Sequence, residues 1–264
     1  MVTAETNAYG SNPDAGKTFV HDGVELYYEI YGVGEPLLLV HGNGESIASL
    51  SAQIDHFRDQ YQVIIMDSRD HGRSANSLED LTYEKMTSDL AALLDHLKVA
   101  PAHVLGWSDG GVEALLLAIH FPNKVSKVAS MASNLNPNGL HPDAFELFKS
   151  MLESMPQGSG RERKVSSIMM EQPNISVREL ETITAPTLVL AGDHDMIRDE
   201  HTLEIFHHIP NSQLAILPNS THLLPFDDPK LFNATVERFF RTPFEKRDRI
   251  KDAMISLEKM QQPH

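Results

Sequence analysis

Three short segments carry reactive side chains directly after apolar runs. Ser108 lies in Gly106-Trp107-Ser108-Asp109-Gly110, Asp193 and Asp195 follow the apolar run 186–191, and His222 follows the run 213–217. A serine hydroxyl becomes a strong nucleophile when a histidine removes its proton and a carboxylate orients that histidine. The sequence therefore predicts nucleophilic catalysis by Ser108 with His222 as the base and an aspartate as the orienting acid.

The two glycines around Ser108 fit a sharp turn between a strand and a helix. The apolar run 102–105 precedes the motif, and the Ala- and Leu-rich stretch 110–121 follows it. A serine at such a turn takes a strained backbone conformation that very small neighbours two residues away tolerate best. The turn would present the hydroxyl near the positive end of the following helix, where an oxyanion is favoured.

Apolar runs and helical patterns alternate along most of the chain, which predicts an α/β fold with a mostly parallel central sheet and helices on both faces. Parallel strands present their carboxyl ends at one edge, where such sheets build their sites. The expected strands are a hairpin over 17–31 turning at Asp22-Gly23, then 36–40, 62–66, 102–105, 127–132, 186–191 and 213–217. The main expected helices are 83–97, 110–121 and 222–240.

The same patterns divide the chain into four parts. Residues 1–17 are polar and predict a flexible leader, while 18–133 and 183–242 form the core. Strand signals vanish over 134–182, which predicts a small helical cap inserted in the sheet domain. The tail 243–264 has apolar residues at helical spacing, so it is either a helix docked on the body or a self-association element that forms a homo-oligomer.

Taken together, the motifs resemble the α/β-hydrolase superfamily over roughly residues 18 to 240. The matching features are His41-Gly42, the loop 67–74, the serine turn, Gly192-Asp193-His194-Asp195 and His222. The resemblance implies that Asp195 is the catalytic acid and that Asp193 is structural. It also implies an oxyanion hole made by the backbone N–H groups of Asn43 and Asp109.

Several other polar residues of these motifs are best interpreted as scaffolding. The resemblance implies structural roles for His41, Arg69, Gly72 and Ser74, and we expect His71 and His194 to be exposed loop residues. Asp70 occupies a position where the family often has glycine. Trp107 either lines the substrate pocket or packs beneath the serine turn.

The substrate follows less directly from the sequence. The motif Gly-Trp-Ser-Asp-Gly-Gly resembles that of valacyclovir hydrolase-like enzymes, which implies a small ester substrate and an Asp109 carboxylate that receives an α-ammonium group. An aspartate in the first turn of a helix is favourable in any case. Apolar cap residues are expected to form the acyl pocket or the core of the cap: Leu140, Phe145, Phe148, Met151, Met155, Met169 and Met170. Lactonase, amidase, peptidase and carbon–carbon-bond hydrolase activities use the same triad and are alternatives. A further alternative is a small-molecule receptor of this fold.

Composition restricts the partners. With 22 basic and 37 acidic residues the formal charge is −15, which disfavours nucleic acid and anionic membranes. There is no cysteine, and the 14 histidines show no zinc-ligand spacing, so we expect neither a metal nor another cofactor. No apolar run approaches the roughly 18 residues that a membrane span needs. The absence of a signal-like N-terminus predicts a cytoplasmic protein.

Overall fold

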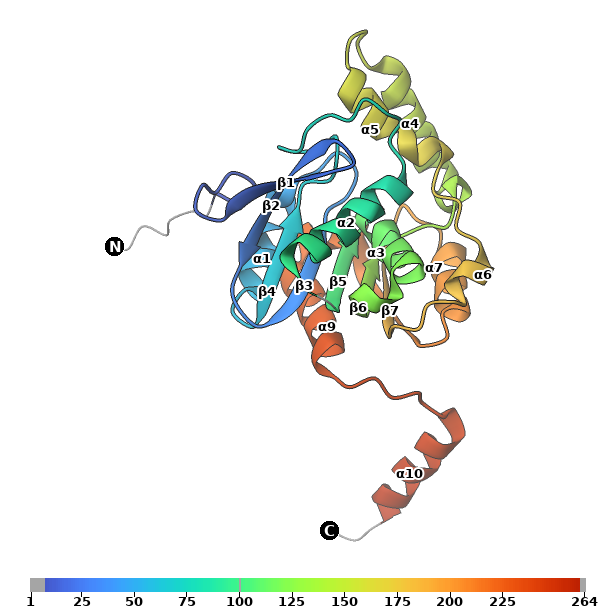
Figure 1. The fold of residues 1–264 in the computed structure, drawn as a ribbon. Coiled ribbons are helices and arrows are strands. Elements are labelled where there is room, and N and C mark those ends of the chain that lie inside the picture. The colour runs from blue at the N-terminus through green and yellow to red at the C-terminus, as the bar shows by residue number, and fades with distance from the viewer. Residues whose placement is uncertain (1–7, 100, 262–264) are drawn as a thin grey trace, which may run out of the picture.

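The computed structural model describes residues 8–99 and 101–261, and within them eight strands form one sheet in the order β1-β2-β4-β3-β5-β6-β7-β8 (Figure 1). The pairs β1/β2 and β2/β4 are antiparallel, whereas every later pair is parallel. The strands are β1 Gly16–His21, β2 Val24–Tyr31, β3 Glu35–Val40, β4 Tyr61–Met66, β5 Ala102–Trp107, β6 Val125–Met131, β7 Thr187–His194 and β8 Ser212–Thr221. This arrangement confirms the predicted α/β fold class.

Helices cover both faces of the sheet. The α-helices are α1 Ser51–Phe57, α2 Tyr83–Leu97, α3 Asp109–His120, α4 Pro142–Ser154, α5 Gly160–Glu171, α6 Val177–Leu180, α7 Asp199–His208, α8 Leu224–Asp227, α9 Pro229–Arg241 and α10 Arg249–Gln261. Three short 3₁₀ turns are η1 Ile47–Leu50, η2 Pro122–Lys124 and η3 Pro137–Gly139. The predicted closing helix 222–240 is divided into α8 and α9, where Asp228 caps α9 ahead of Pro229.

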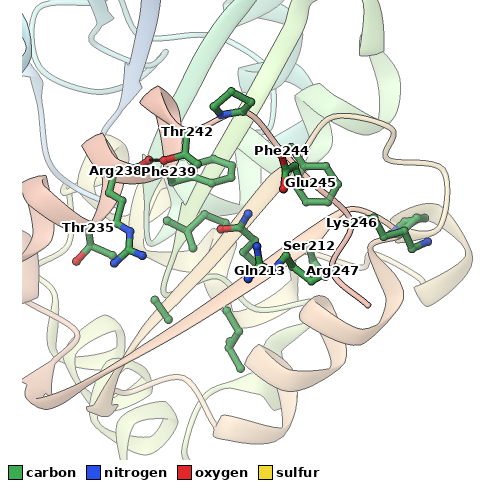
Figure 2. Close-up of a pocket in the computed structure, with 15 residues that line it drawn as sticks. Ser212, Gln213, Thr235, Arg238, Phe239, Thr242, Phe244, Glu245, Lys246 and Arg247 are labelled. Atoms are coloured by element: carbon green, nitrogen blue, oxygen red, sulfur yellow. Dashed lines mark hydrogen bonds between the residues drawn. The ribbon is translucent and has the colours of Figure 1, made fainter. Parts of the chain in front are cut away.

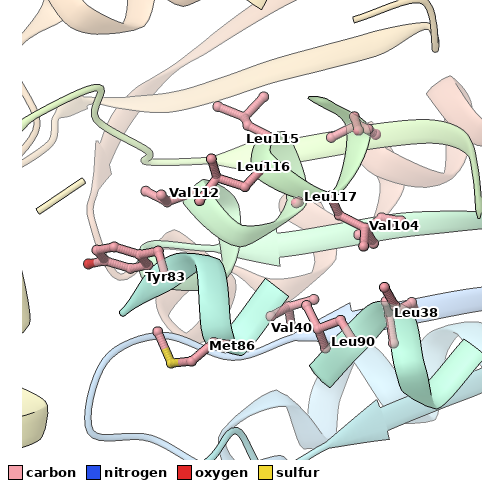
Figure 3. Close-up of a cluster of buried hydrophobic side chains, with 14 of the residues drawn as sticks. Leu38, Val40, Tyr83, Met86, Leu90, Val104, Val112, Leu115, Leu116 and Leu117 are labelled. Atoms are coloured by element: carbon pink, nitrogen blue, oxygen red, sulfur yellow. The ribbon is translucent and has the colours of Figure 1, made fainter. Parts of the chain in front are cut away.

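Strand β3 illustrates why its apolar run is continuous. Leu38 and Val40 pack in the cluster with α2 and α3, while Leu37 and Leu39 pack in a second cluster with α1 and α9. Successive side chains of a strand point to opposite faces, so a strand covered on both faces has no polar alternation. Figure 3 shows the first of these clusters, in which side chains of α2 and α3 gather with those of β3 and β5.

The predicted cap region carries α4, α5 and α6 between β6 and β7. Helices α4 and α5 pack against each other and stand above the sheet edge, whereas α6 contacts α3 and α7 of the body (Figure 1). The predicted cap, residues 134–182, is thus helical, with α4 and α5 as its two longer helices.

The predicted flexible leader is wrong for residues 8–17. Tyr9 is buried, its hydroxyl donates to Asp55 Oδ1 at 2.5 Å, and its ring lies edge-on to Tyr31. The backbone N–H groups of Gly10 and Asn12 both donate to the Glu29 carboxylate. These contacts hold the segment against β2, while residues 1–7 lie outside the described residues.

Within the described part of the C-terminal tail, helix α10 does not dock on the body. Helix α10 stands away from the sheet domain (Figure 1), and its apolar residues Ile250, Met254 and Leu257 are at least half exposed. Residues 243–247 line a groove of about 730 Å³ with β8 and the end of α9 (Figure 2), and no residue of the serine site borders it. Self-association through 243–264 stays a prediction.

Candidate active site

Ser108 lies at the turn from β5 to α3 with φ of 57° and ψ of −120°, the left-handed backbone expected of a strained nucleophile turn. A Cβ at Gly106 would overlap the Gly110 carbonyl, and one at Gly110 would overlap the carbonyl of Val40. The backbone itself therefore demands glycine at both positions. The hydroxyl is held at the carboxyl edge of the sheet, at the N-terminus of α3.

His222 connects Ser108 to Asp195. Its Nε2 lies 3.0 Å from Ser108 Oγ, and its Nδ1 lies 2.7 Å from Asp195 Oδ1. A carboxylate oxygen only accepts, so Nδ1 carries the proton in this arrangement and Nε2 is left to accept from the serine hydroxyl. The structure thus brings together three residues that are 87 and 27 positions apart in sequence order, at the ends of β5, β7 and β8.

The loop after β7 separates the two aspartates. The side chain of Asp195 is fully buried and accepts from the backbone N–H groups of Ile197 and Gly192 as well as from His222. Asp193 is exposed and accepts from the N–H of Ser220, which stiffens the neighbouring loop. The hydrogen bond from the Ser220 N–H lowers the pKa of Asp193. Only Asp195 contacts the imidazole.

The two backbone N–H groups predicted to form an oxyanion hole belong to Asp109, which is next to Ser108 in the chain, and to Asn43, which hydrogen-bonds the Asp109 side chain. Among the hydrogen bonds of residues 8–99 and 101–261, neither the N–H of Asn43 nor that of Asp109 has an acceptor. Asn43 follows β3, and Asp109 is the first residue of α3 directly after Ser108. Unpaired N–H groups beside a nucleophile are the donors that an oxyanion hole needs.

The Asp109 carboxylate is buried and already holds two internal donors. Asn43 Nδ2 donates to Asp109 Oδ2 at 2.8 Å, and the Tyr83 hydroxyl hydrogen-bonds the same carboxylate. Burial raises the pKa of Asp109, and both hydrogen bonds oppose that rise. One turn further along α3, burial raises the pKa of Glu113 well above its ordinary value, and the nearby Asp109 and Asp89 charges add to the effect. The sequence does not single out Tyr83 or Glu113 as site residues, because both lie in stretches whose pattern predicts only a helix.

Trp107 packs beneath the serine turn. Its Nε1 donates to the backbone carbonyl of His222 at 2.8 Å, and its ring meets that of Phe226 edge-on. A Cβ at Gly42 would come within 2.7 Å of the indole, so this glycine makes room for the ring. These contacts fit the alternative in which Trp107 packs beneath the serine turn. The hydrogen bond from its Nε1 also fixes the backbone of His222.

His71 is buried, so its expected exposure is wrong. Its Nδ1 donates to the Arg69 carbonyl, its Nε2 has no partner among the described residues, and its ring lies 5.1 Å from that of His41. His41 accepts from the Ser68 N–H through Nε2 and bonds the Gly42 carbonyl through Nδ1. Desolvation lowers the pKa of each histidine to about 4. Both rings are therefore neutral packing elements at neutral pH.

Cap helix α5 contacts the loop after β4, in which residues 67–71 are buried. Asp70 has a φ of 62°, which explains why glycine suits this position, and Lys164 Nζ lies 3.1 Å from its carboxylate. Arg161 donates to the backbone carbonyls of Asp70 and Gly72. A cavity of about 420 Å³ lies between α5 and this loop, with His71 among its lining residues. The loop therefore anchors the cap, and Arg69 is committed to a buried ion pair with Asp89 at 2.6 Å.

The apolar residues predicted for the cap divide between contact with the sheet domain and exposure at the surface. Phe145 and Phe148 pack against the cluster that contains Leu140, whereas Met151 is half exposed.

Within residues 8–99 and 101–261 no helix is long and apolar enough to cross a membrane. The same residues contain no group of three or more acidic or histidine side chains placed to hold a metal. His201 on α7 is buried and accepts from the Leu135 N–H.

This sheet order, with a serine turn after β5 and a histidine and a carboxylate after β8 and β7, defines the class of α/β hydrolases. Residues 35–164 match the family described as alpha/beta hydrolase fold. The chain is 26% identical to 3-oxoadipate enol-lactonase 2 of Acinetobacter baylyi, with 83% of this chain and 94% of that protein covered. It is 23% identical to the human serine hydrolase BPHL, with 89% of each covered.

A solved hydrolase from Pseudomonas aeruginosa PA01 has the same fold, with a TM-score of 0.74 at 24% identity, covering 88% of this chain and all of that one. The chain belongs to the α/β-hydrolase superfamily, and we describe it as a hydrolase.

Proposed function

We propose that this hydrolase cleaves small carboxylic esters through an acyl-enzyme, with Ser108 as nucleophile, His222 as general base and Asp195 as the orienting acid. The observation that carries the proposal is the relay of 3.0 Å from Ser108 Oγ to His222 Nε2 and 2.7 Å from His222 Nδ1 to Asp195 Oδ1. Asp195 and His222 are buried, which limits competition from water for the hydrogen bond between them, and Ser108 is partly exposed.

In the proposed first half-reaction, His222 Nε2 takes the hydroxyl proton while Ser108 Oγ attacks the ester carbonyl carbon. The carbonyl π electrons move to oxygen, and the N–H groups of Asn43 and Asp109 stabilise the resulting oxyanion. The carbonyl then re-forms, the bond to the leaving alkoxide breaks, and His222 returns its proton to that alkoxide. Asp195 holds the imidazole in the required tautomer and stabilises its cationic form.

In the second half-reaction, His222 deprotonates a water molecule whose oxygen attacks the acyl carbon. Collapse of this second tetrahedral intermediate breaks the bond to Ser108 Oγ, which recovers its proton from His222, and the carboxylic acid leaves. The same residues and the same oxyanion position serve both steps.

Ring opening of a lactone is the second candidate. A lactone is a cyclic ester, so the chemistry is unchanged except that the leaving alkoxide stays attached to the acyl group. The similarity to a protein named 3-oxoadipate enol-lactonase 2 favours this candidate. The preference for α-amino-acid esters predicted from Asp109 stays a prediction, and its test is included in the next subsection.

The proposal is tested by steady-state kinetics with panels of open-chain esters and lactones on four proteins. Wild type should turn over at least one substrate with saturation, and Ser108→Ala should abolish that turnover. Asp195→Asn should lower kcat by about 10⁴-fold because it supports the wrong tautomer of His222. Asp193→Asn is the matched control in the same loop and should keep most of the activity.

Two results would contradict the proposal. Loss of activity in Asp193→Asn with retention in Asp195→Asn would reverse the assignment of the acid. Ligand-induced thermal stabilisation of the wild type without turnover of any substrate would instead support a small-molecule receptor.

A further inference from the structure

The two residues whose N–H groups would form the oxyanion hole are also joined through their side chains. Asn43 follows β3 and Asp109 begins α3, yet Asn43 Nδ2 lies 2.8 Å from Asp109 Oδ2. A hydrogen bond to a carboxylate is shorter and stronger than one between neutral groups. This bond therefore fixes the relative position of two backbone segments that come from different strand ends.

The second amide hydrogen of Asn43 extends the connection to the cap. Asn43 Nδ2 also donates to the backbone carbonyl of Val165 on α5 at 2.9 Å. A primary amide nitrogen has two hydrogens, so both are used, one on the nucleophile turn and one on the cap. On the same helix, Lys164 and Arg161 bind the loop after β4, which holds the turn of α5 that carries Val165 against the body.

The Asp109 carboxylate is arranged to hold these partners. Tyr83, at the start of α2, is buried and shares the carboxylate with Asn43. Both donors belong to the protein, and both come from elements that flank the nucleophile turn. A carboxylate that served chiefly to receive a substrate ammonium would need an open face, whereas Asp109 is 8% exposed.

We infer that the Asp109 side chain is a positioning residue, which acts through Asn43 to set the spacing of the two oxyanion donors and to register cap helix α5 over the nucleophile. This inference rests on the proposed serine hydrolase function and goes beyond it by assigning positioning roles to the side chains of Asn43 and Asp109. It competes directly with the predicted ammonium-binding role of Asp109, because only the ammonium-binding role makes the effect of Asp109→Asn depend on the α-ammonium group of the substrate.

The test compares an ester with its thiono analogue, in which sulfur replaces the carbonyl oxygen. Sulfur is a weak hydrogen-bond acceptor, so the ratio of kcat for the oxygen ester to kcat for the thiono ester reports the alignment of the oxyanion donors. Asn43→Ala should lower kcat for the oxygen ester by about tenfold or more with little change in KM, and the ratio should fall with it. Asp109→Asn keeps one acceptor oxygen and should show a smaller loss of the same kind.

Substrate charge separates the two roles of Asp109. An aminoacyl ester and its des-amino analogue should lose the same factor of kcat/KM in Asp109→Asn if the residue positions the donors. Asn211→Ala is the matched control, since Asn211 also donates from its side-chain amide to a backbone carbonyl but lies directly before β8, outside the serine site. It should leave all of these ratios unchanged.

The inference is overturned if both variants retain the ratio of oxygen ester to thiono ester, or if Asp109→Asn loses activity only toward the aminoacyl ester. Should Asn43→Ala not fold, Asp109→Asn alone decides between these outcomes. Failure of the proposed function is recognised separately, because wild type would then show no turnover that depends on Ser108.

Discussion

Lowering the pH should destabilise this protein through His71. The ring is buried in the loop after β4, which lines a cavity together with cap helix α5, and desolvation lowers its pKa from 6.5 to about 4. A histidine whose pKa is lowered by folding contributes stability that is present above pH 6.5 and is lost as the pH falls toward 4. The unfolded chain takes up the proton over this window, and the folded chain does not.

The size of the effect follows from those two values. Between pH 7 and pH 5 the unfolded-state His71 becomes almost fully protonated while the folded ring stays neutral, which costs about 2 kcal/mol of unfolding free energy. His71→Asn removes the titrating ring and keeps an N–H donor for the Arg69 carbonyl. Its stability should therefore fall by about 2 kcal/mol less than that of wild type over the same pH change.

Urea unfolding followed by far-ultraviolet circular dichroism at pH 7 and pH 5 measures both changes. The difference between the two proteins cancels the other titrating groups, and His207→Asn on the exposed side of α7 controls for the loss of an imidazole. An equal loss of stability in wild type and His71→Asn would refute the reasoning, because it would mean that the buried ring takes up its proton as readily as in the unfolded chain.

Three further predictions concern the serine turn, a buried acid and the tail. Gly110→Ala should lower the unfolding free energy by about 1–3 kcal/mol and abolish esterase activity, because the added Cβ would overlap the Val40 carbonyl. Gly160→Ala is the control because a Cβ there has no neighbour within 4 Å, and equal thermal stabilities of the two variants would contradict the prediction. Glu113→Gln should gain stability over wild type as the pH rises above 4.5, since burial raises the pKa of Glu113; parallel pH profiles in urea unfolding would contradict it. Removal of 243–264 should abolish self-association of the full chain in sedimentation velocity, and identical behaviour of both proteins would refute a role of the tail.

The features that could be predicted from the sequence are those that depend on short stretches of chain. The glycines around Ser108 are required by one turn, and Asp195 and His222 each follow a buried strand whose apolar run is unmistakable. Because parallel strands end at a common edge, three separate strand ends were enough to bring the nucleophile, acid and base together.

The features that could not be predicted depend on packing between distant elements. Tyr83 reaches Asp109 only because α2 lies against α3, and His71 is buried in a loop that cap helix α5 contacts from a distant part of the chain. Neither contact has a local signature. Tyr9 did carry one, since an aromatic residue in a polar segment has apolar surface to bury, and its contact with Asp55 shows where the predicted leader ends.

The assignment of Ser108 as the nucleophile is tested most directly by covalent labelling. A fluorophosphonate probe reacts with an activated serine, and peptide mapping by mass spectrometry identifies the residue that carries it. We predict a single adduct on Ser108 in the wild type, a much slower reaction in His222→Ala, and none in Ser108→Ala. An adduct on another residue, or rapid ester turnover by a wild-type protein whose Ser108 stays unlabelled, would contradict the proposed mechanism.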